Sequence, residues 1–285
     1  MTLSEGIIEP EFSRSCDFTI LIPVRNGADY IEAALQSALG QTTERLHVIV
    51  SDNQSSDDTA QILERYRSDA RVRIVRQAES LSMLAHFNAC LDLVETKYYM
   101  LLCHDDLLAS PDALERAVEV AEREADVSAV YCDLQYIDQA GRHLAYRRFD
   151  RAGEIDGDVI GRKAVLSMRN QFGIPLLVRT VSRSTHRYDT HLPYVADVEM
   201  SWFLANVGKT YHLPLAYIAN RYHANNSTRG LMNNMLREMK LVAQSHAMPL
   251  NKLASVRMSL SSASMALAKT LFFKAIHLRD VMNRG

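Results

Sequence analysis

The sequence predicts an α/β fold in which a mainly parallel central sheet is flanked by helices on both faces. Up to residue 132, short apolar runs rich in β-forming residues alternate with stretches whose apolar residues recur at helical spacing. Neighbouring parallel strands need right-handed crossover connections, and helices supply them. A length of 285 residues with 47% hydrophobic content is also enough for a sizeable core.

The first half of the chain contains the regular alternation. The expected strands cover residues 18–24, 46–50, 72–75, 98–103 and 127–132, and the helices between them are marked by residues 31–39, 62–66, 81–94 and 111–124. Ser110 and Pro111 suit the N-cap and first position of the last of these helices. After residue 134 we expect a hairpin over 136–144, helices over 158–168 and 194–204, and strands over 172–179 and 211–219.

Composition excludes several classes of protein. The formal net charge of -2 gives no basic footprint for nucleic acid. The four cysteines show no C-x-x-C spacing and three lie in apolar segments, so we expect reduced core residues and a cytoplasmic location. Residues 1–16 mix acidic and apolar residues and predict neither a signal peptide nor a membrane span.

The run from Tyr98 stops abruptly at two adjacent carboxylates, Asp105 and Asp106. In an open α/β sheet, ligands bind at the carboxyl ends of the strands. Neighbouring carboxylates repel each other unless water or a cation neutralises them, and a divalent cation carrying substrate phosphates is one such partner. The alternative is that the two residues only begin the loop before Ser110.

Polar residues follow other strands in the same way. Arg25 and Asn26 come just after the first strand and Asp52 after the second, so the fold brings them to the same edge as the Asp105 pair. Asn88, the polar member of an otherwise apolar helical stripe, is included among the ligand-binding candidates. Glycine-rich phosphate loops are absent, which argues against a dinucleotide-dependent dehydrogenase and a P-loop enzyme.

Two later segments carry further candidates. Asp197 and Glu199 lie in the first turn of the expected helix over 194–204, where they also complement the helix dipole. Their i, i+2 spacing places them on different faces, so at most one points into a given site. The segment 220–230 is polar and basic, and Arg221, His223 and Arg229 suit either a solvated connector or a loop closing over a diphosphate.

Taken in order, these residues resemble the family 2 glycosyltransferases, an inverting group with the Rossmann-like GT-A fold. The similarity runs from about residue 19 to residue 229. It implies that Pro23, Arg25, Asn26 and Asp52 contact the base and ribose of a nucleotide-sugar donor. It also implies that Asp105, with Asp106 beside it, holds a divalent metal (Mg²⁺ or Mn²⁺) on the diphosphate.

The resemblance also assigns the later candidates. It places Asp197 where such enzymes have their catalytic base, with Glu199 as a lesser group, and His223 and Arg229 against the donor phosphates. Cys103 replaces the first carboxylate of the usual Asp-x-Asp, and Ala196 replaces an acidic residue that often precedes the base. Trp202 lacks the Gln-x-x-Arg-Trp context of processive synthases, so we expect one sugar per encounter.

The expected function is therefore metal-assisted, inverting, non-processive transfer from a nucleotide-diphosphate sugar, with a UDP-sugar as the expected donor. The acceptor would be a glycan or a lipid-linked acceptor, as in surface polysaccharide or glycoconjugate biosynthesis. Cys103 and Ala196 motivate an alternative, a catalytically inactive nucleotide-sugar-binding or scaffold homologue. We expect an N-terminal tail at 1–16, a catalytic domain at 17–230 divided into a nucleotide-binding half (17–133) and an acceptor half (134–230), and a helical extension at 231–285.

The C-terminal residues 251–285 form a basic, amphipathic stretch. Leu253, Val256 and Leu260 begin its apolar series, and Asp280 is its only acid. Such a stretch can lie in the interface of an anionic membrane, which would place the protein peripherally on the inner face. The alternatives are packing on the catalytic domain and a homodimer through the C-terminal helices.

Overall fold

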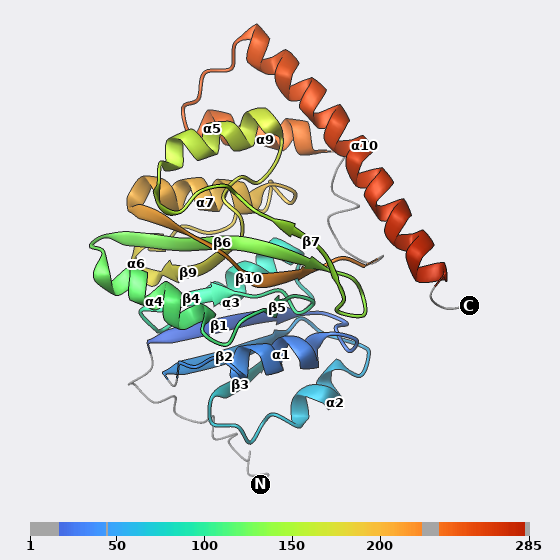
Figure 1. The fold of residues 1–285 in the computed structure, drawn as a ribbon. Helices are drawn as coiled ribbons and strands as arrows, with labels where there is room; N and C mark the ends of the chain where they lie inside the picture. The colour runs from blue at the N-terminus through green and yellow to red at the C-terminus, as the bar shows by residue number, and fades with distance from the viewer. Residues whose placement is uncertain (1–16, 44, 224–233, 283–285) are drawn as a thin grey trace.

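The computed structural model describes residues 17–43, 45–223 and 234–282, without the side chains of 266 and 269–282. Figure 1 shows a layered α/β molecule in which a central sheet carries helices on both faces. The strands are β1 (Phe18–Val24), β2 (Leu46–Asp52), β3 (Val72–Arg76), β4 (Tyr98–Leu101), β5 (Leu107–Leu108), β6 (Val127–Ile137), β7 (His143–Arg147), β8 (Gly153–Ile155), β9 (Pro175–Arg179) and β10 (Lys209–Arg221).

The helices follow the predicted order, except that a short helix over residues 180–183 was not predicted. They are α1 (Ile31–Leu39), α2 (Thr59–Glu64), α3 (Met83–Leu91), α4 (Ala113–Arg123), α5 (Gly157–Ser167), α6 (Thr180–Arg183), α7 (Ala196–Val207), α9 (Met235–Ser245) and α10 (Lys252–Met282). The sheet order is β3-β2-β1-β4-β9-β6-β10-β5, with β7 paired to β6 and β8 paired to β10. The predicted α/β fold class is confirmed.

The first half of the sheet is parallel, as predicted. β1 lies between β2 and β4 and pairs with both in parallel, and β3 pairs in parallel with β2. Alternate residues of β1 enter different cores: Ile20 and Ile22 pack with α1, while Leu21 packs on the α3 side. Burial on both faces is what an uninterrupted apolar strand requires.

The second half of the sheet is mixed. β9 inserts between β4 and β6 and is antiparallel to both, whereas β10 runs parallel to β6 over most of its length. β5, β7 and β8 are short antiparallel additions at the margins. The predicted hairpin over 136–144 is present as the β6–β7 turn, where Gly141 adopts a φ of 79°.

Several predicted helix starts are wrong by two or three residues, and α4 is one example. α4 begins at Ala113 with Asp112 as its N-cap residue, two residues later than the Ser110–Pro111 start expected from sequence. The Ser110 hydroxyl donates to the Asp112 carboxylate, so the pair forms a local turn before the helix. Among the described cysteines, Cys90, Cys103 and Cys132 are free thiols.

The C-terminal helices pack on the domain. Met235 and Met239 of α9 and Met258 of α10 are buried in the same core as Trp202 of α7. The described part of α10 therefore packs on the catalytic domain, which is one of the alternatives predicted for this segment. Among the described helices, none combines the length and apolar composition that a membrane span requires.

Buried His86 gives a stability prediction. Its Nε2 lies 2.9 Å from the Ser51 hydroxyl, and burial lowers its pKa to about 4 although the charge of Asp52 opposes this. Below its ordinary pKa of 6.5 the unfolded chain takes up a proton that the folded chain does not, so stability falls as pH decreases from 6.5 towards 4. The wild type should lose stability between about pH 7 and 4.5, and this loss should be about 2.5 kcal/mol smaller in His86→Gln.

Urea unfolding at the two pH values measures this difference. Exposed His191 supplies the matched control, and His191→Gln should keep the wild-type pH dependence. An unchanged pH dependence in His86→Gln would contradict a neutral, buried His86.

Candidate functional site

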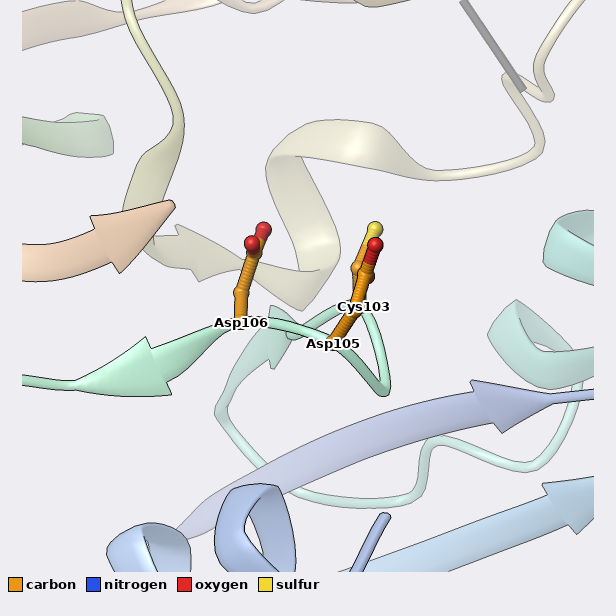
Figure 2. Close-up of side chains that lie close together, drawn as sticks. All are labelled: Cys103, Asp105 and Asp106. Carbon is orange, nitrogen blue, oxygen red and sulfur yellow. The ribbon is translucent and has the colours of Figure 1, made fainter. Parts of the chain in front are cut away.

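Three potential metal ligands lie together after β4. The Sγ of Cys103 and a carboxylate oxygen from each of Asp105 and Asp106 are all within 4.8 Å of one another. Figure 2 shows that the three side chains leave the loop in the same direction. The sequence-predicted carboxylate pair is therefore a cluster at the carboxyl end of a central strand, as expected for a ligand site in an open sheet.

Asp106 is the more deeply buried carboxylate, with 4% of its surface exposed. Both of its oxygens accept from Asn220 Nδ2, at 3.0 and 2.9 Å, and Oδ1 accepts from the Arg221 backbone N–H at 2.8 Å. Burial and the neighbouring charge of Asp105 raise its pKa to about 8 despite these donors. Because ionising Asp106 is costly here, a cation bound nearby would stabilise its charged form.

Asp105 is held by His223. Its Oδ2 lies 3.0 Å from His223 Nε2, and its backbone carbonyl accepts from Arg221 Nε at 2.9 Å. Burial tends to raise the pKa of Asp105, but the His223 hydrogen bond and nearby His104 outweigh burial and leave the pKa lowered. Of the two carboxylates, Asp105 is thus the one that remains charged more easily.

Cys103 completes the cluster as a thiol. Burial is the main cause of its strongly raised pKa, and the charges of the two aspartates add to it. The negative charge of Asp197, in the first turn of α7, adds to this rise. The second predicted carboxylate region therefore acts on the first electrostatically.

The loop after β1 is shaped by its neighbours. Asn26 adopts a φ of 52°, a conformation that asparagine tolerates better than most residues, and its side-chain oxygen accepts from Ser56 N at 2.8 Å. A Cβ on Gly27 would lie 2.5 Å from the His104 ring, so only glycine allows this contact. Arg25 is exposed beside them.

Asp52 ends β2 in a buried position beside a residue that sequence reasoning missed. Its Oδ2 accepts from Arg76 Nη1 at 2.8 Å, and its Oδ1 accepts from the Ser55 backbone N–H at 2.9 Å. Arg76 ends β3 and remains half exposed. The same strand-end argument that selected Asp52 could have selected Arg76, because β3 is the next parallel strand. Pro23, also predicted here, is buried within β1.

The two carboxylates of α7 lie in different surroundings, as their spacing predicts. Asp197 is exposed, and its Oδ2 accepts from Asn170 Nδ2 at 2.7 Å. The Asn170 side-chain oxygen is itself held by the backbone N–H groups at 172 and 173, which fixes the direction of the amide. Glu199 is buried and lies 3.1 Å from His186 Nε2. Of these two carboxylates, only Asp197 is exposed to solvent.

Three other candidates have different outcomes. Asn88 exchanges two hydrogen bonds, both 2.9 Å, with the backbone of Tyr188, so its amide ties α3 to the segment before α7. A donor-binding role for Asn88 stays a prediction. Arg221, which the basic segment offered for a diphosphate, instead points its guanidinium at the carbonyls of Asp138 and Gln139. Arg229 lies outside the described residues.

A separate cavity of about 740 Å³ lies between β6, β10 and the residues before α4. Tyr146, Arg148 and Arg151 line it, together with Asp133 and Tyr217. None of the sequence-predicted site residues is among its lining. The strand-end cluster, where the titratable groups converge, is therefore the candidate site on chemical grounds.

Comparison with known proteins identifies the family. The model of the glycosyl transferase family 2 matches residues 19–174, which cover β1 to the residues before β9 and include the whole cluster. The chain belongs to glycosyl transferase family 2. The resemblance drawn from the strand-end residues is confirmed.

Relatives and solved structures agree with this family 2 assignment. An uncharacterized glycosyltransferase of Rickettsia prowazekii is 27% identical over 220 residues, covering 76% of this chain and 67% of that protein. Chondroitin synthase of Escherichia coli is 33% identical over 128 residues, or 45% of this chain, but only 18% of the synthase is covered. The chain thus spans a small part of that relative's length.

Two solved structures share the fold of this family 2 chain. S. aureus TarS 1-349 in complex with UDP-GlcNAc has a TM-score of 0.63 at 14% identity, covering 86% of this chain and 79% of that chain. The mannosyltransferase PcManGT from Pyrobaculum calidifontis, in complex with GDP-Man and Mn2+, has a TM-score of 0.57 at 14% identity and covers 97% and 90%. Both likenesses confirm the GT-A type of fold.

Proposed function

We propose that this family 2 glycosyltransferase moves a sugar from a nucleotide-diphosphate donor to a hydroxyl group of an acceptor, with inversion and with a divalent metal. The observation that carries the proposal is the convergence of two carboxylate regions from distant segments. Asp105 and Asp106 follow β4, and Asp197 lies in the first turn of α7, where its negative charge adds to the raised pKa of Cys103 in the cluster. One region suits the diphosphate and the other suits the acceptor.

The cluster fits a divalent cation. A carboxylate has about four lone-pair positions, so Asp106 retains accepting capacity beyond its three hydrogen bonds from Asn220 and Arg221. Asp105 would supply a second, more acidic carboxylate, and water and phosphate oxygens would provide the remaining ligands of Mg²⁺ or Mn²⁺. When bound, such a cation neutralises charge that develops on the leaving diphosphate.

Asp197 is the proposed general base. It is exposed and aligned by Asn170, so it can take the proton of the acceptor hydroxyl as that oxygen attacks the anomeric carbon. Direct attack on the face opposite the leaving diphosphate inverts the anomeric centre. Glu199, buried against His186, keeps the segment before α7 in place and takes no part in proton transfer.

The nucleotide and its sugar would lie along the edge formed by Arg25, Asn26 and Asp52, with Arg76 beside Asp52. A UDP-sugar is the proposed donor, supported by the UDP and UDP-GlcNAc bound in the TarS structures. The Escherichia coli chondroitin synthase supports a glycan acceptor in polysaccharide biosynthesis, and a lipid-linked acceptor fits the same chemistry.

We propose that the two halves of the catalytic domain and the C-terminal extension have different roles. Residues 17–133 would bind the nucleotide, residues 134–230 would bind the acceptor and carry the base, and residues 231–285 would form a helical extension that packs on α5 and α7. We propose that the reaction occurs in the cytoplasm, which the free thiols of Cys90 and Cys132 support.

A thermal-shift screen of nucleotide sugars with Mn²⁺ tests donor binding. We expect a UDP-sugar to raise Tm when Mn²⁺ is present and to raise it much less with EDTA, because ligands that bind only the folded chain stabilise it. A chain stabilised only by a different nucleotide class would contradict the UDP proposal. No stabilisation by any nucleotide sugar would contradict the proposed function.

A further inference from the structure

Helix α10 presents a row of large apolar side chains to solvent. Leu253, Val256, Leu260 and Leu267 are 77%, 56%, 68% and 63% exposed. Their i, i+3, i+7 and i+14 spacing places them on one face of the helix, which we call the outer stripe. Of the ten large hydrophobic side chains that are exposed in the described part of the chain, these four lie on this single face. Such concentration marks an interaction surface.

The opposite face of the same helix packs on the domain. Met258 is fully buried and Met265 is 8% exposed, and the Ser261 hydroxyl donates to the Leu166 carbonyl at 3.1 Å. Leu260 follows Met258 by two residues and therefore lies about 200° around the helix. Figure 1 shows α10 running along one side of the molecule, with its C-terminal part extending past the other elements. Packing on the domain thus leaves the outer stripe uncovered.

Basic side chains flank the outer stripe. Lys252 and Arg257 are exposed, and each lies about 70° from the middle of the stripe, one on either side. Residues 252–285 contain six basic residues and one acidic residue. This segment therefore carries +5 in a chain whose net charge is -2, and the remainder carries -7.

This charge distribution helps to decide whether a second copy of the chain or a lipid surface covers the outer stripe. A second copy packed stripe to stripe would bring Lys252 and Arg257 against the same basic face, and no acidic residue occurs from 252 to 279 to pair with them. An anionic lipid surface offers both an apolar layer for the leucines and phosphates for the flanking cations. Lys and Arg reach such phosphates while their aliphatic stems remain on the apolar surface.

We propose that the outer stripe of α10 binds the surface of an anionic membrane, with the acidic remainder of the molecule facing away from the lipid. The apolar side chains enter the interface, and Lys252 and Arg257 contact lipid phosphates. This attachment uses no residue of the strand-end cluster, so it stands independently of the proposed reaction.

Co-sedimentation of the full chain with vesicles tests the proposal. We expect binding to phosphatidylcholine vesicles that contain phosphatidylglycerol, weaker binding to pure phosphatidylcholine, and weaker binding at high salt. The triple variant L253S/L260S/L267S should reduce the partition coefficient roughly 10- to 100-fold, because three exposed leucines no longer leave water. K252E/R257E should reduce binding mainly at low salt.

The matched control replaces exposed apolar residues elsewhere. Val181 and Leu215 are 78% and 57% exposed, and V181S/L215S should bind vesicles as the wild type does. No binding to anionic vesicles, or equal binding of the triple variant and the wild type, would overturn the proposal. Light scattering after gel filtration gives a further result: a dimer that L253S/L260S/L267S converts to a monomer would assign the stripe to a second copy and overturn membrane binding.

Discussion

Asp197→Asn is expected to lower turnover by about two to four orders of magnitude while donor binding survives. The substitution preserves shape but removes the basic oxygen that would accept the acceptor's proton. Steady-state kinetics with saturating donor and acceptor measure kcat, and calorimetric titration of the donor measures binding. Because Asn170 donates to Asp197 at 2.7 Å, a melting curve must accompany the assay to detect any local disturbance.

Glu199→Gln is the matched control on the same helix. Glu199 is buried against His186, so we expect this variant to lose stability and to retain most of its kcat. A larger loss of kcat in Glu199→Gln than in Asp197→Asn, with both variants folded, would place the base on the other face of α7.

Asp105→Ala is expected to abolish the metal-dependent part of donor affinity. The bond from Arg221 Nε reaches the Asp105 backbone carbonyl, so the loop keeps that contact when the carboxylate is removed. Loss of metal-assisted stabilisation of the leaving diphosphate should also lower turnover by about 10²-fold or more. Calorimetric titration of the donor nucleotide with Mn²⁺ and with EDTA measures the two affinities.

Asp150→Asn controls for the loss of one negative charge. Asp150 is exposed and has a φ of 53°, which asparagine accommodates. This variant should keep the wild-type difference between Mn²⁺ and EDTA. If Asp105→Ala also keeps that difference, Asp105 is not a metal ligand.

The sequence was informative where local pattern and topology agree. The apolar runs of β1, β2 and β4 end at polar residues, and parallel pairing with β1 brings those ends to one edge. The common edge of Asn26, Asp52 and the Asp105 pair was therefore predictable from the sequence alone. The i, i+2 spacing of Asp197 and Glu199 likewise predicted that they lie on different faces of the helix, and in the structure one is exposed and the other buried.

Other features depend on contacts between segments far apart in the chain. Asn170 reaches Asp197 from an irregular loop, and Asn220 reaches Asp106 from the end of β10, so neither is marked by a local pattern. The antiparallel insertion of β9 between β4 and β6 is likewise determined by tertiary packing. Its short apolar run would fit either strand direction.

The C-terminal helix packs on the domain with a different set of residues from the one that the sequence pattern suggested. The apolar residues at 253, 256, 260 and 267 suggested either a lipid-facing or a packing helix. The structure instead assigns packing to Met258 and Met265 and leaves the suggested residues exposed. A two-sided apolar pattern hides this distinction because both faces contribute to the same periodicity.

The proposed reaction is tested by measuring release of nucleoside diphosphate from a UDP-sugar in the presence of an acceptor. We expect turnover with Mn²⁺ in the wild type, loss of turnover with EDTA or in Asp105→Ala, and a strongly reduced rate in Asp197→Asn. A wild-type chain that binds the donor with Mn²⁺ but releases no nucleoside diphosphate with any acceptor or with water would contradict catalysis. It would support the catalytically inactive, nucleotide-sugar-binding alternative that Cys103 and Ala196 motivate.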